Sequence, residues 1–425
     1  GLASHNRYVH LFINGLYWGV YDPTERPDGS FGEAYLGGEK EDYDVINEGA
    51  VVDGTRAAYD EMLALSNLAS PAAYDRMRQL LDLPQFIDYM LLHFYVAHQD
   101  WGQNKNWYTL RPKDGRRGFL YVPWDGEMIL DQLNHNRVNN VDVPSGLHTK
   151  LLDNPEYRLA FADRARRHLF HDGPLTPAAV AARWMTRARE VELPMVAESA
   201  RWGDYRRDVH PYQNPPYPLY TRDNQWRAEQ NRLLNTYFPQ RTAILLGQLR
   251  AAGLYPTVDA PELNRSGGRV ERGFQVEMSG ADGTVYFTTD GSDPRVALSG
   301  AVAGSARPYR VPISLEQSLR LKARTLRQGV WSALTEVDFQ VADVPLSLRF
   351  TEIMYHPPGG DAFEFVELRH LGPVSLDVTG YSFGGIQYIF PPGTIVRPGQ
   401  LLVLASRLSP TSFAVRYPDV SVFGY

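Results

Sequence analysis

The residue pattern of this chain changes near Gly253, and that change constrains the fold more than any other feature of the sequence. Upstream, residues 155–252 are mainly helix formers with helical periodicity, whereas short alternating segments separated by Gly, Pro and Asp turns follow. A helix buries residues that are three or four apart, whereas a strand buries every second residue, so we expect the two parts to have separate cores. A chain of 425 residues is also long enough for about two to four domains. The sequence therefore predicts a multidomain protein with an all-β C-terminal part.

The N-terminal part mixes strand and helix signals. Residues 8–21 alternate around an Asn-Gly turn, which is typical of a tight hairpin. Residues 57–70 and a segment from Pro84 onward carry apolar residues at helical spacing, and residues 107–122 indicate a second hairpin directly afterwards. Further helices are expected over residues 157–169, 177–191 and 222–249. Together these signals predict an α+β domain over residues 1–255.

Composition narrows the classes of function. The chain has no cysteine, which excludes disulfides, thiolate metal sites and cysteine nucleophiles. Its net charge of −6 argues against a nucleic-acid-binding surface. No run of about 18 apolar residues occurs, so no transmembrane segment is expected. The chain starts at Gly1 without a leader and stops at Tyr425 within an unfinished β pattern, so we expect it to be incomplete at both ends.

The residues with the chemistry of a reactive site gather around the second hairpin. Asp100, Asn104 and Asn106 share one loop before it, and Asp125 follows it. Phosphoryl transfer uses such groups: a carboxylate near the attacking hydroxyl, and an amide oxygen and a second carboxylate for the metal ion at the nucleotide phosphates. Mg²⁺ prefers oxygen ligands of this kind. A lone Asp in a polar turn is by default a turn residue, so the hypothesis depends on the group as a whole.

Two other catalytic classes lack their residue patterns. His93 and His98 are five residues apart and no His-Glu-x-x-His sequence occurs, which argues against a zinc hydrolase. No Gly-x-Ser-x-Gly sequence occurs in the α/β part, which argues against a serine hydrolase. The tryptophans near the candidate loop are interpreted as core aromatics rather than as substrate-stacking residues: Trp101, Trp107 and Trp124.

Three separated stretches occur in an order that matches a known family: residues 9–21 with Glu25, residues 100–108, and Trp124-Asp125. Over roughly residues 1–252 the chain resembles the spore-coat CotH kinase family, which has an atypical kinase fold and includes members active on protein substrates. The resemblance implies binding of ATP with Mg or Mn, and phosphorylation of a hydroxyl on a protein. It assigns Asp100 to the substrate hydroxyl, Glu25 to the nucleotide site and Asp125 to the metal.

The resemblance leaves two roles open. The metal-binding Asn is Asn104 or Asn106, on either side of Lys105, which stands where a typical kinase loop has its Asn; the Asn-Trp-Tyr context favours Asn106. A kinase also needs a Lys at the α/β-phosphates, and Asn47 stands where relatives often carry it. Lys40 and Lys105 are the candidate nucleotide-binding lysines, and a Lys upstream of Gly1 is a further alternative. Without such a Lys, the chain would be a catalytically inactive pseudokinase with a structural or adhesive role at the cell surface.

The β-rich part carries two further motifs. Residues 288–294 read Thr-Thr-Asp-Gly-Ser-Asp-Pro, and through them residues 256–343 resemble the C-terminal module of chitobiase-type enzymes. The strands Glu-Ile-Met-Tyr and Glu-Phe-Val-Glu-Leu give residues 346–425 a resemblance to the lamin-tail domain. Both resemblances imply immunoglobulin-like β-sandwiches, joined near Asp343-Val344-Pro345. They imply a spacer role, with a cell-envelope glycan as a further partner, and an extracytoplasmic location in a bacterium.

Overall fold

The computed structural model of the chain describes residues 2–102, 104–140, 142, 144–210, 217–280, 282–342 and 347–425. The expected joint at Asp343-Val344-Pro345 lies outside these residues. The chain divides into two compact units. The first comprises Gly1–Ser266, Met278–Arg310 and Lys322–Glu336, and the second Gly267–Glu277, Val311–Leu321 and Val337–Tyr425. The expected multidomain organisation, with an α+β N-terminal domain and a β-rich C-terminal region, is confirmed.

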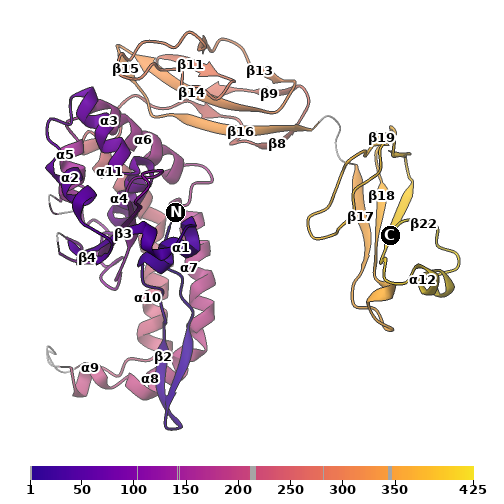
Figure 1. Ribbon diagram of the computed structural model, residues 1–425, viewed down its shortest axis with the longest axis horizontal. Coiled ribbons are helices and arrows are strands. Elements are labelled where there is room, and N and C mark those ends of the chain that lie inside the picture. Colours follow the sequence, from indigo (N-terminus) through magenta and orange to yellow (C-terminus); the bar gives the residue numbers. More distant parts are fainter. Residues whose placement is uncertain are drawn as a thin grey trace. The chain divides into compact units, whose positions relative to one another are not determined.

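The segment up to Ser266 mixes helices and strands (Figure 1). Its strands are β1 (Val9–Ile13), β2 (Leu16–Tyr21), β3 (Tyr43–Asn47), β4 (Ala50–Asp53), β5 (Trp107–Pro112), β6 (Leu120–Pro123) and β7 (Glu262–Leu263). Its helices are α1 (Gly29–Leu36), α2 (Ala57–Ala64), α3 (Pro71–Leu80), α4 (Leu83–Val96), α5 (Ser145–Leu151), α6 (Pro155–Leu169), α7 (Pro177–Glu192), α8 (Pro194–Trp202), α9 (Tyr205–Asp208), α10 (Arg227–Arg232) and α11 (Phe238–Ala251). Within the described residues, no helix is both long and apolar enough to cross a membrane.

Two expected helices differ from those observed. The helix expected over residues 57–70 ends at Ala64, because Leu65 already has an extended ψ of 133°, and Asn67 then adopts a left-handed φ of 53°. The single helix expected over residues 222–249 is divided, since π-helical turns at Arg222–Trp226 and Leu233–Tyr237 flank α10. An i→i+5 turn inserts an extra residue into the helical repeat and rotates the faces that follow.

The central sheet is antiparallel, with strand order β4-β3-β5-β6. Helix α4 protects its edge, because Gln85 accepts a hydrogen bond from the Tyr121 amide at 2.8 Å and donates one to the Tyr121 carbonyl at 2.5 Å. Nine residues of α4 are buried in the main core: Leu83, Phe86, Ile87, Tyr89, Met90, Leu91, His93, Phe94 and Tyr95. Helix α4 and this sheet therefore form the rigid frame of the domain.

The hairpin β1–β2 forms a sheet of its own beside helix α8 (Figure 1). The backbone amide of Val20 donates to Glu198 Oε2 at 2.8 Å, and Trp202 Nε1 donates to the Trp18 carbonyl at 2.6 Å. The Trp18 and Trp202 rings meet edge to face at 5.5 Å. Side chains of α8 thus form hydrogen bonds with backbone amide and carbonyl groups on the outer edge of β2.

The remaining chain is β-rich. One sheet has the strand order β12-β11-β14-β16-β8, with β15 paired to β14, and a second sheet has the order β17-β18-β21-β22. The elements are β8 (Gly268–Glu271), β9 (Phe274–Val276), β10 (Met278–Ser279), β11 (Thr284–Thr288), β12 (Arg307–Pro308), β13 (Ile313–Leu315), β14 (Leu319–Arg327), β15 (Val330–Trp331), β16 (Thr335–Ala342), β17 (Leu348–Met354), β18 (Phe365–His370), β19 (Leu376–Asp377), β20 (Ile395–Val396), β21 (Leu401–Ala405), α12 (Pro410–Arg416) and β22 (Val422–Gly424). The division into two immunoglobulin-like sandwiches stays a prediction.

Candidate active site

The end of helix α4 is fixed by a buried cation. Arg241 of α11 donates from Nε to the Tyr95 carbonyl at 2.7 Å and from Nη1 to the Leu133 carbonyl at 2.8 Å. A positive charge there complements the negative end of the helix dipole and satisfies carbonyls that have no partner in the helix. Ala97 then adopts a φ of 52°, and the chain turns into the loop that carries Asp100.

Two tryptophans anchor that loop. Trp101 is buried, and its Nε1 donates to the Tyr89 hydroxyl at 2.8 Å. Trp107, the first residue of β5, is also buried and donates from Nε1 to the Gly102 carbonyl at 3.1 Å. The prediction that both are core aromatics is confirmed. The loop is therefore held at both ends, and the polar residues between them are presented by a rigid frame.

Asp100, Lys105 and Asn106 are brought together in this loop. Lys105 Nζ donates to Asp100 Oδ1 at 2.8 Å, and Asn106 Nδ2 donates to the Asp100 backbone carbonyl at 2.6 Å. The Lys105 ammonium lowers the pKa of the Asp100 carboxyl, and the same hydrogen bond raises the pKa of Lys105. Both side chains remain accessible, at 30% exposure for Asp100 and 64% for Lys105. Asp100 is thus an accessible carboxylate beside a cation.

The two candidate asparagines have different environments. Asn106 is buried, has a φ of 66°, and its backbone amide donates to Glu48 Oε1 at 2.8 Å. Asn104 is exposed, in the turn where Gly102 and Lys105 exchange backbone hydrogen bonds of 3.4 and 3.3 Å. Asn adopts the left-handed region more readily than most residues, so this conformation assigns no role by itself. The choice between Asn104 and Asn106 as metal ligand stays a prediction.

Asp125 follows β6 and is exposed, with a φ of 52°. A hydrogen bond shared with Asp125, followed by partial burial, raises the pKa of Glu127. The negative charge of Asp100 acts on Glu127 in the same direction. Asp125 and Glu127 are therefore a pair of neighbouring acids that a cation would stabilise.

His93 and His98 meet, although their spacing did not suggest it. Their Nδ1 atoms are 3.0 Å apart and the rings stack at 5.1 Å, because the turn at Ala97 brings His98 back over the helix. Burial, and then the charge of Arg137, lowers the pKa of His98 to about 4. The pair is therefore neutral near pH 7 and belongs to the support of the loop.

Lys40 lies toward the end of β3 that is farther from the Asp100 loop, and Glu25 is held by partners of its own. Strand β3 pairs with β5 so that Asn47 is opposite Tyr108, beside the loop, and Tyr43 is opposite Pro112 at the far end. Lys40 precedes Tyr43, so it belongs to the end of β3 that is about 13 Å from Asn47 at 3.3 Å per residue. Glu25 accepts hydrogen bonds from the His5 amide at 3.0 Å and the Tyr35 hydroxyl at 2.8 Å.

Two acidic residues near this loop, Glu48 and Glu127, were not among the site residues predicted from the sequence. Glu48 accepts the Asn106 amide hydrogen bond, and both Glu48 and Glu127 raise the pKa of Lys105, after the larger effect of Asp100. Glu48 lies in the turn after β3, which is far from Asn106 in the sequence, so only the pairing of β3 with β5 brings them together. A Glu-Gly pair after a strand predicts only a turn.

The side chains around this loop include oxygen atoms of the type that Mg²⁺ prefers. No group of three or more His, Asp or Glu side chains in the described parts of the chain is arranged to hold a metal ion by itself. Mg²⁺ commonly takes one or two carboxylates and completes its shell with substrate phosphates and water. Asp125 and Asn106 carry one carboxylate and one amide oxygen of this kind, and the amide nitrogen of Asn106 already donates to the Asp100 carbonyl.

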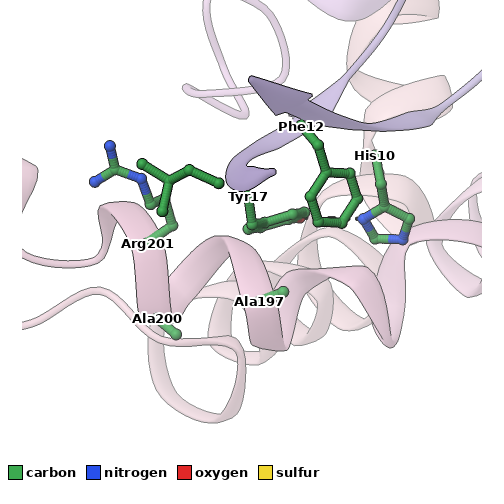
Figure 2. A pocket seen from close by; sticks show the side chains of 7 residues that line it. His10, Phe12, Tyr17, Ala197, Ala200 and Arg201 are labelled. Carbon is green, nitrogen blue, oxygen red and sulfur yellow. Dashed lines mark hydrogen bonds between the residues drawn. The ribbon is translucent and has the colours of Figure 1, made fainter. Parts of the chain in front are cut away.

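A separate apolar groove lies between the β1–β2 hairpin and α8 (Figure 2). Its volume is about 610 Å³. The residues that line it are His10, Phe12, Leu16, Tyr17, Ala197, Ala200 and Arg201. None of the site residues expected from the sequence is among them, so this groove is distinct from the Asp100 loop.

Comparison with known proteins gives two matches to family models. A model described as CotH kinase protein matches residues 2–245, which is more than half of the chain. A model described as Fn3 associated matches residues 276–335. No curated protein matches the chain.

Proposed function

This chain belongs to the CotH kinase family, and we propose that it transfers the γ-phosphoryl group of ATP, with Mg or Mn, to a hydroxyl of a protein substrate. The observation that supports this proposal is the Asp100–Lys105–Asn106 arrangement beside Asp125 and Glu127. It combines an accessible carboxylate, a cation and oxygen ligands on a rigid loop. Phosphoryl transfer depends mainly on positioning and electrostatic stabilisation, which such a loop supplies.

Asp100 would orient the attacking hydroxyl. The hydrogen bond from Lys105 lowers the pKa of Asp100, so the group is a carboxylate at neutral pH and a weak base. It therefore acts first as a hydrogen-bond acceptor that aims the hydroxyl, and it receives the proton as the bond to phosphorus forms. Asn106 holds the backbone of Asp100 in place through the 2.6 Å bond to its carbonyl.

Lys105 is the lysine that the geometry favours for the phosphate groups. Its ammonium lies 2.8 Å from Asp100 and is 64% exposed, whereas Lys40 belongs to the opposite end of β3. An exposed ammonium beside the acceptor carboxylate would attract the γ-phosphate to the attacking hydroxyl. Asp125 and Asn106 would hold the metal ion, with Asn104 as the alternative ligand; when bound, the ion neutralises the phosphate charge.

The proposal is tested with the full chain by measuring ATP affinity calorimetrically, with and without Mg²⁺ or Mn²⁺, together with phosphate transfer to candidate proteins. Asp125→Asn is expected to abolish metal-dependent ATP binding. Asp100→Asn is expected to keep that binding and to lower the transfer rate at least about 100-fold. Asp75→Asn, an exposed partner of Arg78, is the matched control. Unchanged transfer in Asp100→Asn would overturn the assignment.

A pseudokinase is the second candidate, and the observation that favours it is the neutral Asn47 at the loop end of β3. In that case the chain would act as a structural or adhesive protein of the cell surface. ATP binding without any transfer, in a chain whose fold is intact, would support it.

We further propose that the β-rich part consists of a chitobiase-type module and a lamin-tail domain, both immunoglobulin-like, on an extracytoplasmic bacterial protein. The support is the Fn3-associated match together with the β-rich architecture. A cell-envelope glycan is the partner to test. Sedimentation of the full chain with peptidoglycan or chitin, compared with a soluble control protein, measures this binding; absence of cosedimentation would contradict it.

A further inference from the structure

The guanidinium of Arg324 is buried between two carboxylates that come from different parts of the chain. Arg324 lies on β14, and its side chain is 2% exposed. Nη1 and Nη2 donate to the two oxygens of Asp163, each at 2.7 Å, and Asp163 belongs to helix α6 of the CotH segment. Nε and Nη2 donate to Asp293 at 2.8 and 2.6 Å, and Nη1 also donates to the Ser332 carbonyl at 3.0 Å.

These contacts use every donor that the side chain has. A guanidinium carries five N–H groups in a fixed planar fork, and five hydrogen bonds are present here. Burial lowers the pKa of Arg324, but the two carboxylates outweigh burial and raise it overall. A buried charge is tolerated when it is paired and fully hydrogen-bonded, and that condition is met.

A second ion pair lies two helical turns away on α6. Arg295 Nη1 and Nη2 donate to the two carboxylate oxygens of Glu156 at 2.9 and 2.5 Å, and the Leu298 amide donates to Glu156 at 3.1 Å. Both side chains are largely buried, with exposures of 12% and 15%. Glu156 and Asp163 are seven residues apart and therefore share one helix face.

The Asp-Gly-Ser-Asp-Pro turn orients the residues that reach α6. Asp290 accepts the Ser292 amide at 2.9 Å, and Asp293 accepts the Arg295 amide at 2.9 Å. Asp293 therefore binds the backbone of Arg295 with the same carboxylate that binds the Arg324 side chain. On the CotH side, Asp163 also accepts the Leu334 amide at 2.8 Å. The most specific motif of this module thus positions the two arginines, Arg295 and Arg324, that pair with α6.

We propose that this turn and Arg324 form a clamp, whose partner is the acidic face of α6 made by Glu156 and Asp163. The segments Met278–Arg310 and Lys322–Glu336 belong to the same compact unit as Gly1–Ser266, and Ala333 is buried in the main core of that unit. Because of the clamp, we expect these strands to unfold together with the CotH domain as one cooperative unit. This differs from the spacer role that the resemblance implies, and it does not depend on phosphoryl transfer.

The test compares Arg324→Lys with wild type in the full chain. Lysine keeps the charge but lacks the planar fork, so it leaves several carboxylate oxygens without donors. We expect hydrogen exchange to rise across α6 as well as β14, and the melting temperature of the CotH unit to fall by at least about 5 °C. Arg320→Lys is the matched control, because Arg320 lies on the same strand and pairs with Asp338 in an exposed bridge.

If Arg324→Lys fails to fold, Glu156→Gln provides a milder break of the same interface. Glu156→Gln is expected to raise hydrogen exchange at residues 295–298, which contact Glu156. Two results would overturn the clamp. One is a rise in exchange confined to the altered side in both variants, and the other is a wild-type calorimetric trace in which Met278–Glu336 unfolds separately from α6.

Discussion

At the scale of single residues, the left-handed backbone of Asn106 allows its side chain to be removed without backbone strain. Asn106 has a φ of 66°, a conformation that glycine adopts without strain. Asn106→Gly therefore keeps the local backbone conformation but removes both the amide oxygen and the hydrogen bond to the Asp100 carbonyl. We expect metal-dependent ATP affinity to fall by at least about 10-fold, since a good hydrogen bond to a charged group is worth about 1.5–3 kcal/mol. Calorimetric titration measures this loss.

Asn104→Gly is the matched comparison, because Asn104 is exposed in the neighbouring turn. We expect its ATP affinity to equal that of wild type and its stability to change by less than about 0.5 kcal/mol. The opposite ranking, with Asn104→Gly impaired and Asn106→Gly unaffected, would reassign the metal ligand to Asn104.

The proximity of site residues was predictable where they are local in sequence, whereas their roles stay predictions. Asp100, Lys105 and Asn106 share one loop, so the motif alone indicated that they would be close. Glu48 and the His93–His98 pair required strand pairing and a left-handed Ala97, neither of which a residue pattern specifies. Alanine has no preference for positive φ, so the reversal at the end of α4 is imposed by tertiary packing.

At the scale of secondary-structure elements, α6 is the helix whose stability should depend most clearly on pH. The hydrogen bond from Arg295 lowers the pKa of Glu156, against the opposing effect of burial. A carboxyl group with a lowered folded-state pKa contributes stability above its ordinary pKa of about 4.3, and that stability is lost as the pH falls through the folded-state value. Wild type should therefore exceed Glu156→Gln in unfolding free energy near pH 7, and the difference should shrink below about pH 4.

Urea unfolding of both proteins between pH 3 and 7 measures that difference. Glu61→Gln serves as the control, because Glu61 pairs with Arg76 at the surface, where both side chains are about half exposed. Exposed pairs contribute about 0–1 kcal/mol, so the control should show little dependence on pH. A Glu156→Gln effect that is the same at every pH would show that packing, and not the charge, stabilises the contact.

Element positions were predictable where strong local signals coincide. Helix α4 combines a capping Asp82, a Pro in its first turn and an apolar face, and it begins one residue before the predicted Pro84. The end of α2 and the π-helical turns around α10 depend on the backbone conformation of single residues. Apolar periodicity does not report that conformation, so it overestimated the length of both helices. Contacts between elements distant in sequence, such as Arg324 with α6, leave no periodic signal.

At the scale of the whole molecule, ligand binding should stabilise the chain only when metal and nucleotide are present together. The described part of the chain has no group of three His, Asp or Glu side chains that could hold a metal alone, and the proposed site of Asp125 and Asn106 would need phosphate oxygens to complete a magnesium shell. We therefore expect EDTA, or Mg²⁺ without nucleotide, to leave the melting temperature unchanged.

Addition of ATP with Mg²⁺ should raise the melting temperature. A ligand that binds only the folded state adds RT ln(1 + [L]/Kd) to the free energy of unfolding, which is about 2.7 kcal/mol at a ligand concentration of 100 times Kd. The increase should grow with the logarithm of ATP concentration and disappear in Asp125→Asn. Differential scanning calorimetry of the full chain distinguishes the effect of ATP from the effect of the clamp. Arg324→Lys should lower the melting temperature measured without ligand, and ATP with Mg²⁺ should still raise that temperature by the same amount as in wild type. An increment that also vanished in Arg324→Lys would instead mean that the β strands support the nucleotide site itself.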